Sequence, residues 1–278
     1  MLSSPARRSW PQWLARAGYA ARGIVFVILA WFTAFAAIDA YRRPIDSKDA
    51  LAALLTQPLG AALLLVITAG LACFALWREA QAFLDIDRFG SDWPALGRRA
   101  AYAAAGLFYA AFASVTLSMA IGMHTADAEH AVHDWTTRLL AHRFGDVAVG
   151  LIGIAIVIGG VAIAVAGIRG EFRHRIALRE KPRRLVTALG RVGYLARAAV
   201  IAIIGVFLVF AALDSNAHEA RGLAGALLEI KRQPHGSLLL GIAACGLLAF
   251  GAYGLAEAFF RRVDGYRPAL GRVSWLSA

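Results

Sequence analysis

The sequence predicts an all-α integral membrane protein with six transmembrane helices, arranged as three parallel hairpin repeats that each carry a short outer amphipathic helix. Apolar residues make up 59% of the chain and charged residues 17%, whereas soluble domains average about 45–50% and about 25%. The apolar residues are gathered in six long blocks, and one short motif recurs three times along the chain. Such self-similarity indicates a repeat architecture.

The six apolar blocks approach or exceed the length needed to cross a bilayer, because a spanning helix requires about 20 mostly apolar residues. They cover residues 23–38, 59–77, 100–123, 147–168, 198–213 and 236–260. The first and fifth blocks are the shortest. They span only if the helix continues backward through the preceding polar segment, whose arginines can extend their charged ends to the membrane surface.

The recurring motif lies at the start of every second block. Its first copy reads Arg-Ala-Gly-Tyr-Ala-Ala-Arg-Gly at residues 16–23, and related copies occupy residues 99–106 and 191–198. Each copy opens a unit made of an apolar block, a polar spacer and a second apolar block. The predicted organisation is a tail at 1–12, repeat 1 at 13–88, repeat 2 at 97–172, a basic cytoplasmic linker at 173–188, repeat 3 at 189–264 and a tail at 265–278.

The polar spacer of each repeat has the pattern of a short amphipathic helix. In repeat 1, Leu51, Leu54 and Leu55 recur at i, i+3 and i+4, and Asp46 or Ser47 is suited to cap the start of the helix. We expect the leucines to face inward and the helix to lie in the membrane interface.

The distribution of basic residues predicts the orientation in the membrane. If both termini are cytoplasmic, 21 of the 29 Lys and Arg residues fall on the inner side, which is the positive-inside bias. We expect a bacterial inner (plasma) membrane protein whose basic cytoplasmic loops contact anionic lipid headgroups. This explains the net charge of +11 without a nucleic-acid partner. A cleavable signal peptide is the alternative for the first block, but its removal would destroy the first hairpin.

Glycines are concentrated in the second apolar block of repeats 2 and 3. In lipid, small residues let helix backbones approach closely, so we expect Gly150, Gly153 and Gly246 to lie at helix–helix contacts. A flexible hinge is the alternative, because glycine is common in membrane helices in general.

The three units resemble a bacterial membrane family known as domain of unknown function 1206. The resemblance rests on Arg-x-Gly-Tyr-x-Ala-Arg-Gly, a later Pro-x-Gly and an aromatic-basic end with an acidic residue, and it covers about residues 14–264. Repeat 2 departs most, with Ala101 for glycine, Ala105 for the second arginine and Arg143 for proline. The family implies no activity, substrate or cofactor.

The inner ends of the helices carry the main candidate site. Tyrosine and arginine lie three residues apart on one helix face in repeats 1 and 3, and the returning helices end with acidic residues. The predicted inner-face polar cluster contains Tyr19, Arg22, Glu79, Asp85, Tyr194, Arg197 and Glu257.

We expect each arginine of this cluster to form an ion pair within its own hairpin. Arg22 would then pair with Glu79 or Asp85, and Arg197 would pair with Glu257. The alternative is a polar ring that lines an inner vestibule.

The outer-side histidines His124, His130 and His133 are the remaining candidates for chemistry. His130 and His133 lie one helical turn apart near acidic residues and could share a metal, but the polar face of an amphipathic helix explains them equally well. No nucleophile elbow or phosphate-binding loop is present in the sequence. We therefore expect no catalytic residue, no metal and no cofactor.

These patterns favour a non-enzymatic scaffold or accessory subunit that contacts the lipid bilayer and a membrane protein partner. The alternative is a small-solute transporter or channel with a pathway along the pseudo-threefold axis, since parallel repeats require an axis along the membrane normal. Polar residues converging on that axis at mid-depth would favour the alternative, and the sequence supplies few of them.

Overall fold

The computed structural model describes residues 10–39, 43–87, 90–123, 128–170 and 180–260. Within these ranges all regular structure is helical, and six helices are long and apolar enough to cross a membrane. The predicted C-terminal tail at 265–278, most of the N-terminal tail, residues 173–179 of the linker and His124 lie outside the described residues.

In each repeat, one or two short helices lie between two long ones. The long helices are α1 (Trp10–Ile38), α3 (Gly60–Phe83), α4 (Trp93–Ala120), α6 (Gly145–Arg169), α7 (Glu180–Leu213) and α9 (Gly236–Phe260). The short helices are α2 (Ser47–Ala52), η1 (Ala53–Thr56), α5 (Ala128–Leu140), η3 (Ala217–Glu219) and α8 (Leu223–Arg232). Because α1 and α7 begin well before their apolar blocks, the predicted backward continuation of both helices is confirmed.

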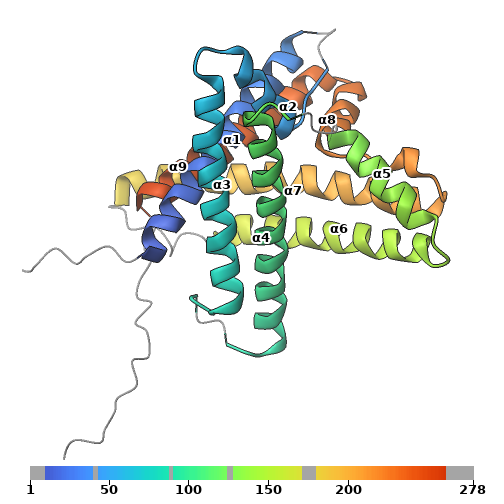
Figure 1. Cartoon of the computed structure of the whole chain (residues 1–278), viewed down its shortest axis with the longest axis horizontal. Helices are drawn as coiled ribbons and strands as arrows, with labels where there is room; N and C mark the ends of the chain where they lie inside the picture. The colour runs from blue at the N-terminus through green and yellow to red at the C-terminus, as the bar shows by residue number, and fades with distance from the viewer. Residues whose placement is uncertain (1–9, 40–42, 88–89, 124–127, 171–179, 261–278) are drawn as a thin grey trace, which may run out of the picture.

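The long helices pair mainly across repeat boundaries. The most extensive contacts join α6 to α7, α1 to α9 and α3 to α4, whereas the contacts of α1 with α3 and of α7 with α9 within single repeats are smaller. Each major pair thus combines the returning helix of one repeat with the first helix of the next, and α9 of repeat 3 returns to α1 of repeat 1. In Figure 1, α3 and α4 run down the view while α6 and α7 run across it, so the predicted parallel hairpins are not confirmed.

Glycines lie where paired helices approach most closely. A Cβ atom added to Gly23 of α1 would lie 2.9 Å from the backbone oxygen of Gly251 on α9. Real Cβ contacts are essentially never this short. The close approach of α1 and α9 therefore depends on the missing side chains at both positions.

The three glycines predicted at helix contacts differ in how tightly they are packed. An added Cβ on Gly153 would lie 2.9 Å from the backbone oxygen of Gly205 on α7, and one on Gly246 would overlap Ala196 of α7. Gly150 has an ordinary van der Waals contact at 3.4 Å. Two of the three therefore lie at contacts that admit only glycine without a shift of the helices.

The short helix of repeat 1 packs its first half inward. Asp46 accepts a hydrogen bond from the backbone N–H of Asp49 at 2.9 Å and so caps α2. Leu51 is fully buried and Leu54 partly buried, but Leu55 is exposed. The expectation for Leu55 was wrong because the chain tightens into the 3₁₀-helix η1, in which three residues complete a turn and Leu55 rotates outward.

A tight turn links each short helix to the returning long helix. In repeat 1, Leu59 has φ 63°, in the left-handed region, and an added Cβ on Gly60 would overlap a backbone oxygen of η1. His235 and Gly236 repeat this geometry, with φ 62° at His235. The Gln-Pro-x-Gly sequence is thus the turn that directs the chain back along the core.

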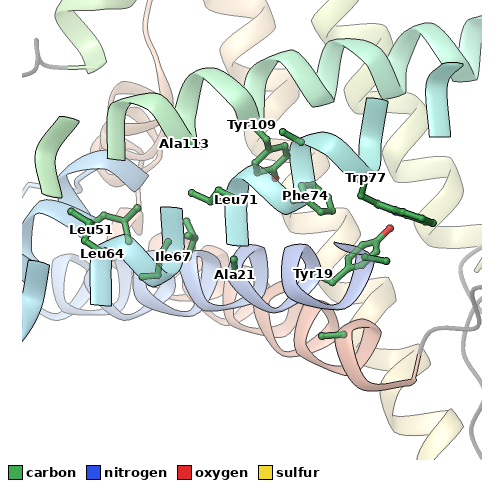
Figure 2. Packing of buried hydrophobic residues seen from close by; sticks show 14 of the residues in the cluster. Tyr19, Ala21, Leu51, Leu64, Ile67, Leu71, Phe74, Trp77, Tyr109 and Ala113 are labelled. Carbon is green, nitrogen blue, oxygen red and sulfur yellow. The ribbon is translucent and has the colours of Figure 1, made fainter. Parts of the chain in front are cut away.

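The largest hydrophobic cluster lies among α1, α3 and α4 (Figure 2). The ring of Phe74 on α3 stands edge-on to Tyr19 of α1, with centroids 5.2 Å apart, and to Tyr109 of α4, with centroids 4.6 Å apart. Leu64 and Leu71 of α3 continue the cluster and are fully buried. This aromatic end of the cluster forms one wall of the candidate site.

Candidate functional site

Arg22 of α1 and Glu257 of α9 form a buried ion pair. Arg22 Nη2 donates to Glu257 Oε2 at 2.7 Å, and both side chains are 2% exposed. An unpaired charge at this depth would be strongly destabilising, so each side chain requires the other. Because Arg22 belongs to repeat 1 and Glu257 to repeat 3, the ion pair joins the first and last repeats.

Aromatic rings surround the Arg22 guanidinium group. Its central carbon lies 4.8 Å from the ring centroid of Tyr19, 5.1 Å from that of Phe74 and 4.9 Å from that of Phe250. These distances are within the range of cation–π attraction, which is strongest when the cation is removed from water. The rings thus supply part of the stabilisation that Arg22 loses on leaving water.

Two further arginines share these rings. Arg78 of α3 lies 4.9 Å from the Phe74 centroid, and Arg197 of α7 lies 5.0 Å from the Phe250 centroid. Arg197 also experiences the positive charges of Arg22 and Arg78. We call Arg22, Arg78, Arg197, Phe74, Phe250 and Glu257 the arginine cluster. It gathers three guanidinium groups around two phenylalanine rings, and Glu257 is ion-paired with one of them, Arg22.

Arg78 is held by a chain of side-chain hydrogen bonds. Its Nη1 donates to Gln81 Oε1 at 3.0 Å, and Gln81 Nε2 donates to Asp87 Oδ2 at 2.7 Å. The Arg78 guanidinium also lies 4.8 Å from the ring centroid of Tyr102 on α4. Arg78 therefore links α3 to α4 much as Arg22 links α1 to α9.

The remaining residues of the predicted polar cluster divide into two groups. Tyr194 packs edge-on against Phe250, with ring centroids 5.6 Å apart, and so lies beside the arginine cluster. Glu79 instead packs against Gly106 of α4, and its buried Oε1 has no hydrogen-bond partner among the described residues. Asp85 accepts a hydrogen bond from the Gly90 N–H in the loop after α3. The structure thus does not bring all seven predicted residues together.

The predicted pairing within hairpins was wrong. Arg22 pairs with Glu257 of repeat 3 instead of with Glu79 or Asp85 of its own repeat. Arg197 forms no ion pair or hydrogen bond among the described residues and has Phe250 and Phe26 as ring neighbours.

Repeat register explains this change of partner. The Gly23–Gly251 contact of α1 and α9 recurs in α6 and α7, where an added Cβ on Gly160 would lie 3.1 Å from the Ala198 oxygen. Arg22 precedes Gly23 as Arg197 precedes Ala198, and Glu257 follows Gly251 at the same distance along the chain as Ala166 follows Gly160. Ala166 of repeat 2 therefore occupies the position that Glu257 holds in repeat 3, so α6 offers no acid there for Arg197.

The predicted polar cluster left out Phe74, Phe250 and Arg78, although Arg78 belongs to the aromatic-basic end of the recurring unit. Phe74 and Phe250 each occur 14 residues after the glycine of the Gln-Pro-x-Gly turn, so an alignment of the two turns could have identified them as equivalent. Arg78 has no arginine counterpart in repeat 3, where Gly254 occupies the equivalent position, and no internal comparison would have selected it.

The histidine hypothesis is only partly open to test. The side chain of His130 lies outside the described residues, as does His124. His133 lies against the ring of His218, with centroids 4.5 Å apart. No group of three His, Cys, Asp or Glu side chains that could hold a metal occurs in the part of the chain that the structure describes.

Comparison with known proteins bears directly on the repeats. The family model of the Domain of Unknown Function (DUF1206) matches residues 17–85, 100–170 and 192–261. The chain is also 29% identical over 259 residues to "Uncharacterized protein YxxB" of Bacillus subtilis (strain 168), covering 92% of this chain and 93% of that protein. No solved structure matches the chain significantly. Three matches that together cover most of its length show that the chain belongs to the DUF1206 family and contains three copies of its domain.

Proposed function

We propose that this chain is a multi-pass protein of the bacterial plasma membrane that acts as a non-enzymatic scaffold or accessory subunit. The observation that carries the proposal is the Arg22–Glu257 pair. These are the two most deeply buried charges among the described residues, and they are used to join the first repeat to the last. Buried charges arranged in this way specify which helices meet, a role for which buried polar groups are known.

A lipid environment is supported by the outward faces of the long helices. The exposed large apolar side chains of α6 include Val147, Leu151, Ile154, Ile158, Val161 and Ile168. Soluble monomers rarely expose continuous apolar surfaces, whereas lipid tails cover them without cost. We expect anionic lipid headgroups at the basic inner loops and a membrane protein partner against the exposed helix faces.

The buried threonine hydroxyl groups of the long helices are occupied locally. Thr33 donates to the backbone oxygen of Leu29 in its own helix at 2.8 Å. The hydroxyl groups of Thr68 and Thr116 bond to one another between α3 and α4 at 2.9 Å. These contacts support a packed interior over a solute pathway.

Cysteine labelling of intact cells tests the membrane orientation. In a background without the native Cys73 and Cys245, the impermeant reagent should modify Ser47→Cys and leave Ser91→Cys unmodified, because the charge distribution places only Ser47 outside. Modification of Ser91→Cys alone would invert the proposed orientation.

Native mass spectrometry tests the scaffold role. We expect the protein extracted in mild detergent to carry a second polypeptide at fixed stoichiometry. The Arg22→Met, Glu257→Leu variant should retain it, because an apolar pair of similar volume can replace a structural ion pair. The proposal would be contradicted if the protein purified without a second polypeptide and catalysed saturable solute uptake in proteoliposomes, and if the double variant lost this uptake. That result would favour a transporter.

A further inference from the structure

A second polar site lies between repeats 2 and 3, at the end of the long helices remote from the arginine cluster. The short helix α5 packs against η3 and α8 there (Figure 1). A pocket of about 370 Å³ opens between them, and its lining includes four basic side chains, His133, His218, Arg221 and Arg232. The scaffold role uses none of these residues.

The two arginines share one carboxylate. Arg221 Nη1 lies 2.7 Å from Glu229 Oε2, and Arg232 Nη1 lies 3.5 Å from the same oxygen. One guanidinium charge is therefore uncompensated within this triad. Each guanidinium also has five N–H donors, so most of their hydrogen-bonding capacity remains for a ligand.

The position of Arg221 is fixed by its surroundings. Its guanidinium carbon lies 5.0 Å from the ring centroid of Phe207 on α7. A side chain held between a ring and a carboxylate loses little further freedom when it binds a ligand, which favours binding.

His133 supplies an independent sign of a missing partner. Its Nε2 atom is buried and has no hydrogen-bond partner among the described residues, and buried polar atoms normally have one. Its Nδ1 lies 3.7 Å from Asp134 Oδ1, beyond hydrogen-bond distance. The ring of His218 lies against it, with centroids 4.5 Å apart, so two imidazoles line one wall of the pocket.

The charge of the pocket favours an anion over a metal ion. Two histidines alone could begin a metal site, but no third His, Cys, Asp or Glu ligand joins them within the described ranges. Two guanidinium groups in the same lining would repel a cation. Arginine is the side chain best matched to oxyanions, because its planar fork binds two oxygens at once.

We propose that this pocket binds a phosphate group, carried either by free phosphate compounds or by a phospholipid headgroup. A phosphate has several acceptor oxygens, enough to accept hydrogen bonds from Arg221, Arg232 and the Nε2–H of His133 together. The pocket volume of about 370 Å³ lies at the lower end of the range of small-molecule sites. It accommodates a phosphate with part of the group that carries it.

Calorimetric titration of the full-length protein in detergent with inorganic phosphate, at constant ionic strength, tests the proposal. We expect saturable binding that weakens at least about tenfold in His133→Ala, Arg232→Gln, because losing a charge-assisted hydrogen bond has an effect of this size. The matched control Arg143→Gln removes one charge from another exposed arginine before α6 and should leave affinity within about twofold. Circular dichroism verifies that each variant is folded.

A lipid arm distinguishes the source of the phosphate. Native mass spectrometry of protein released from phosphatidylglycerol nanodiscs should show one retained lipid that the double variant loses, if the headgroup is the ligand. Free phosphate binding without lipid retention assigns the site to soluble compounds. Absence of both, equal weakening by Arg143→Gln, or binding of Zn²⁺ by the two histidines with no phosphate binding would overturn the proposal.

Discussion

The helix pairs α1–α9 and α6–α7 pack in the same register, but the arginine of each pair has different partners. Both pairs cross where small residues meet, Gly23 with Gly251 and Ala198 with Gly160. In α1–α9, Arg22 pairs with Glu257 at 2.7 Å. In α6–α7, Ala166 occupies the position equivalent to Glu257, and the Arg197 guanidinium lies against the rings of Phe26 and Phe250.

This difference separates two requirements of helix pairing. The contacts of α6 with α7 are at least as extensive as those of α1 with α9, so close packing does not need the ion pair. Helices α6 and α7 are consecutive in the chain, and this proximity itself favours their pairing. Helices α1 and α9 are the first and last of the described helices, so proximity in the chain does not favour their pairing. The ion pair therefore occurs in the helix pair whose members are farthest apart along the chain.

The largest expected effect distinguishes the two arginines. Glu257→Ala should lower the free energy of unfolding by about 3–5 kcal/mol, because it leaves Arg22 buried and unpaired. Arg197→Ala should change it by no more than about 1 kcal/mol, the size of a cation–π contact. Unfolding of the purified protein in mixed micelles measures both, and equal losses would remove the distinction between the two pairs.

The glycine contacts should differ by a smaller amount. An added Cβ on Gly251 meets Gly23 and Val27 atoms at 2.8–2.9 Å, whereas on Gly160 the nearest atoms lie at 3.1–3.3 Å. We expect Gly251→Ala to cost about 1–3 kcal/mol through overpacking and Gly160→Ala less.

Gly241 and Gly159 provide matched controls in the same two helices, because an added Cβ meets nothing within 4 Å at either position. Alanine there should be neutral or stabilising by up to about 1 kcal/mol, since it favours the helix. Losses at the controls as large as at Gly251 would mean that helix contact is not the cause.

The smallest expected effect comes from restoring the missing acid. Ala166→Glu should give Arg197 a partner and raise the free energy of unfolding by about 1 kcal/mol, a typical net value for a charge-assisted bond. Ala166→Gln, which has the same shape without the charge, should not. A loss with Glu as large as with Gln would show that Arg197 does not face residue 166.

The sequence was sufficient to predict the elements and insufficient to predict their partners. Apolar blocks, the recurring motif and the Gln-Pro-x-Gly turn are local signals, and they placed the six long helices and the segments that connect them. The sequence also predicts both Arg22 and Glu257 as members of the polar cluster, because an arginine beside an apolar block requires a carboxylate. Their pairing depends on which repeat packs against which, and no local pattern carries that information. The predicted inward orientation of Leu55 was wrong for a similar reason. The change from α-helix to 3₁₀-helix at Ala53 depends on the turn that follows it.

A pair of double-mutant cycles tests most directly whether arginine and acid pair across repeats. The first cycle combines Arg22→Ala with Glu257→Ala, and the second combines Arg197→Ala with Glu257→Ala, each read as free energy of unfolding in mixed micelles. The structure predicts a coupling energy of at least about 1 kcal/mol in the first cycle and below about 0.5 kcal/mol in the second, because residues that share no direct contact act nearly additively. Strong coupling of Arg197 with Glu257 and none of Arg22 with Glu257 would contradict the account and restore pairing within each hairpin.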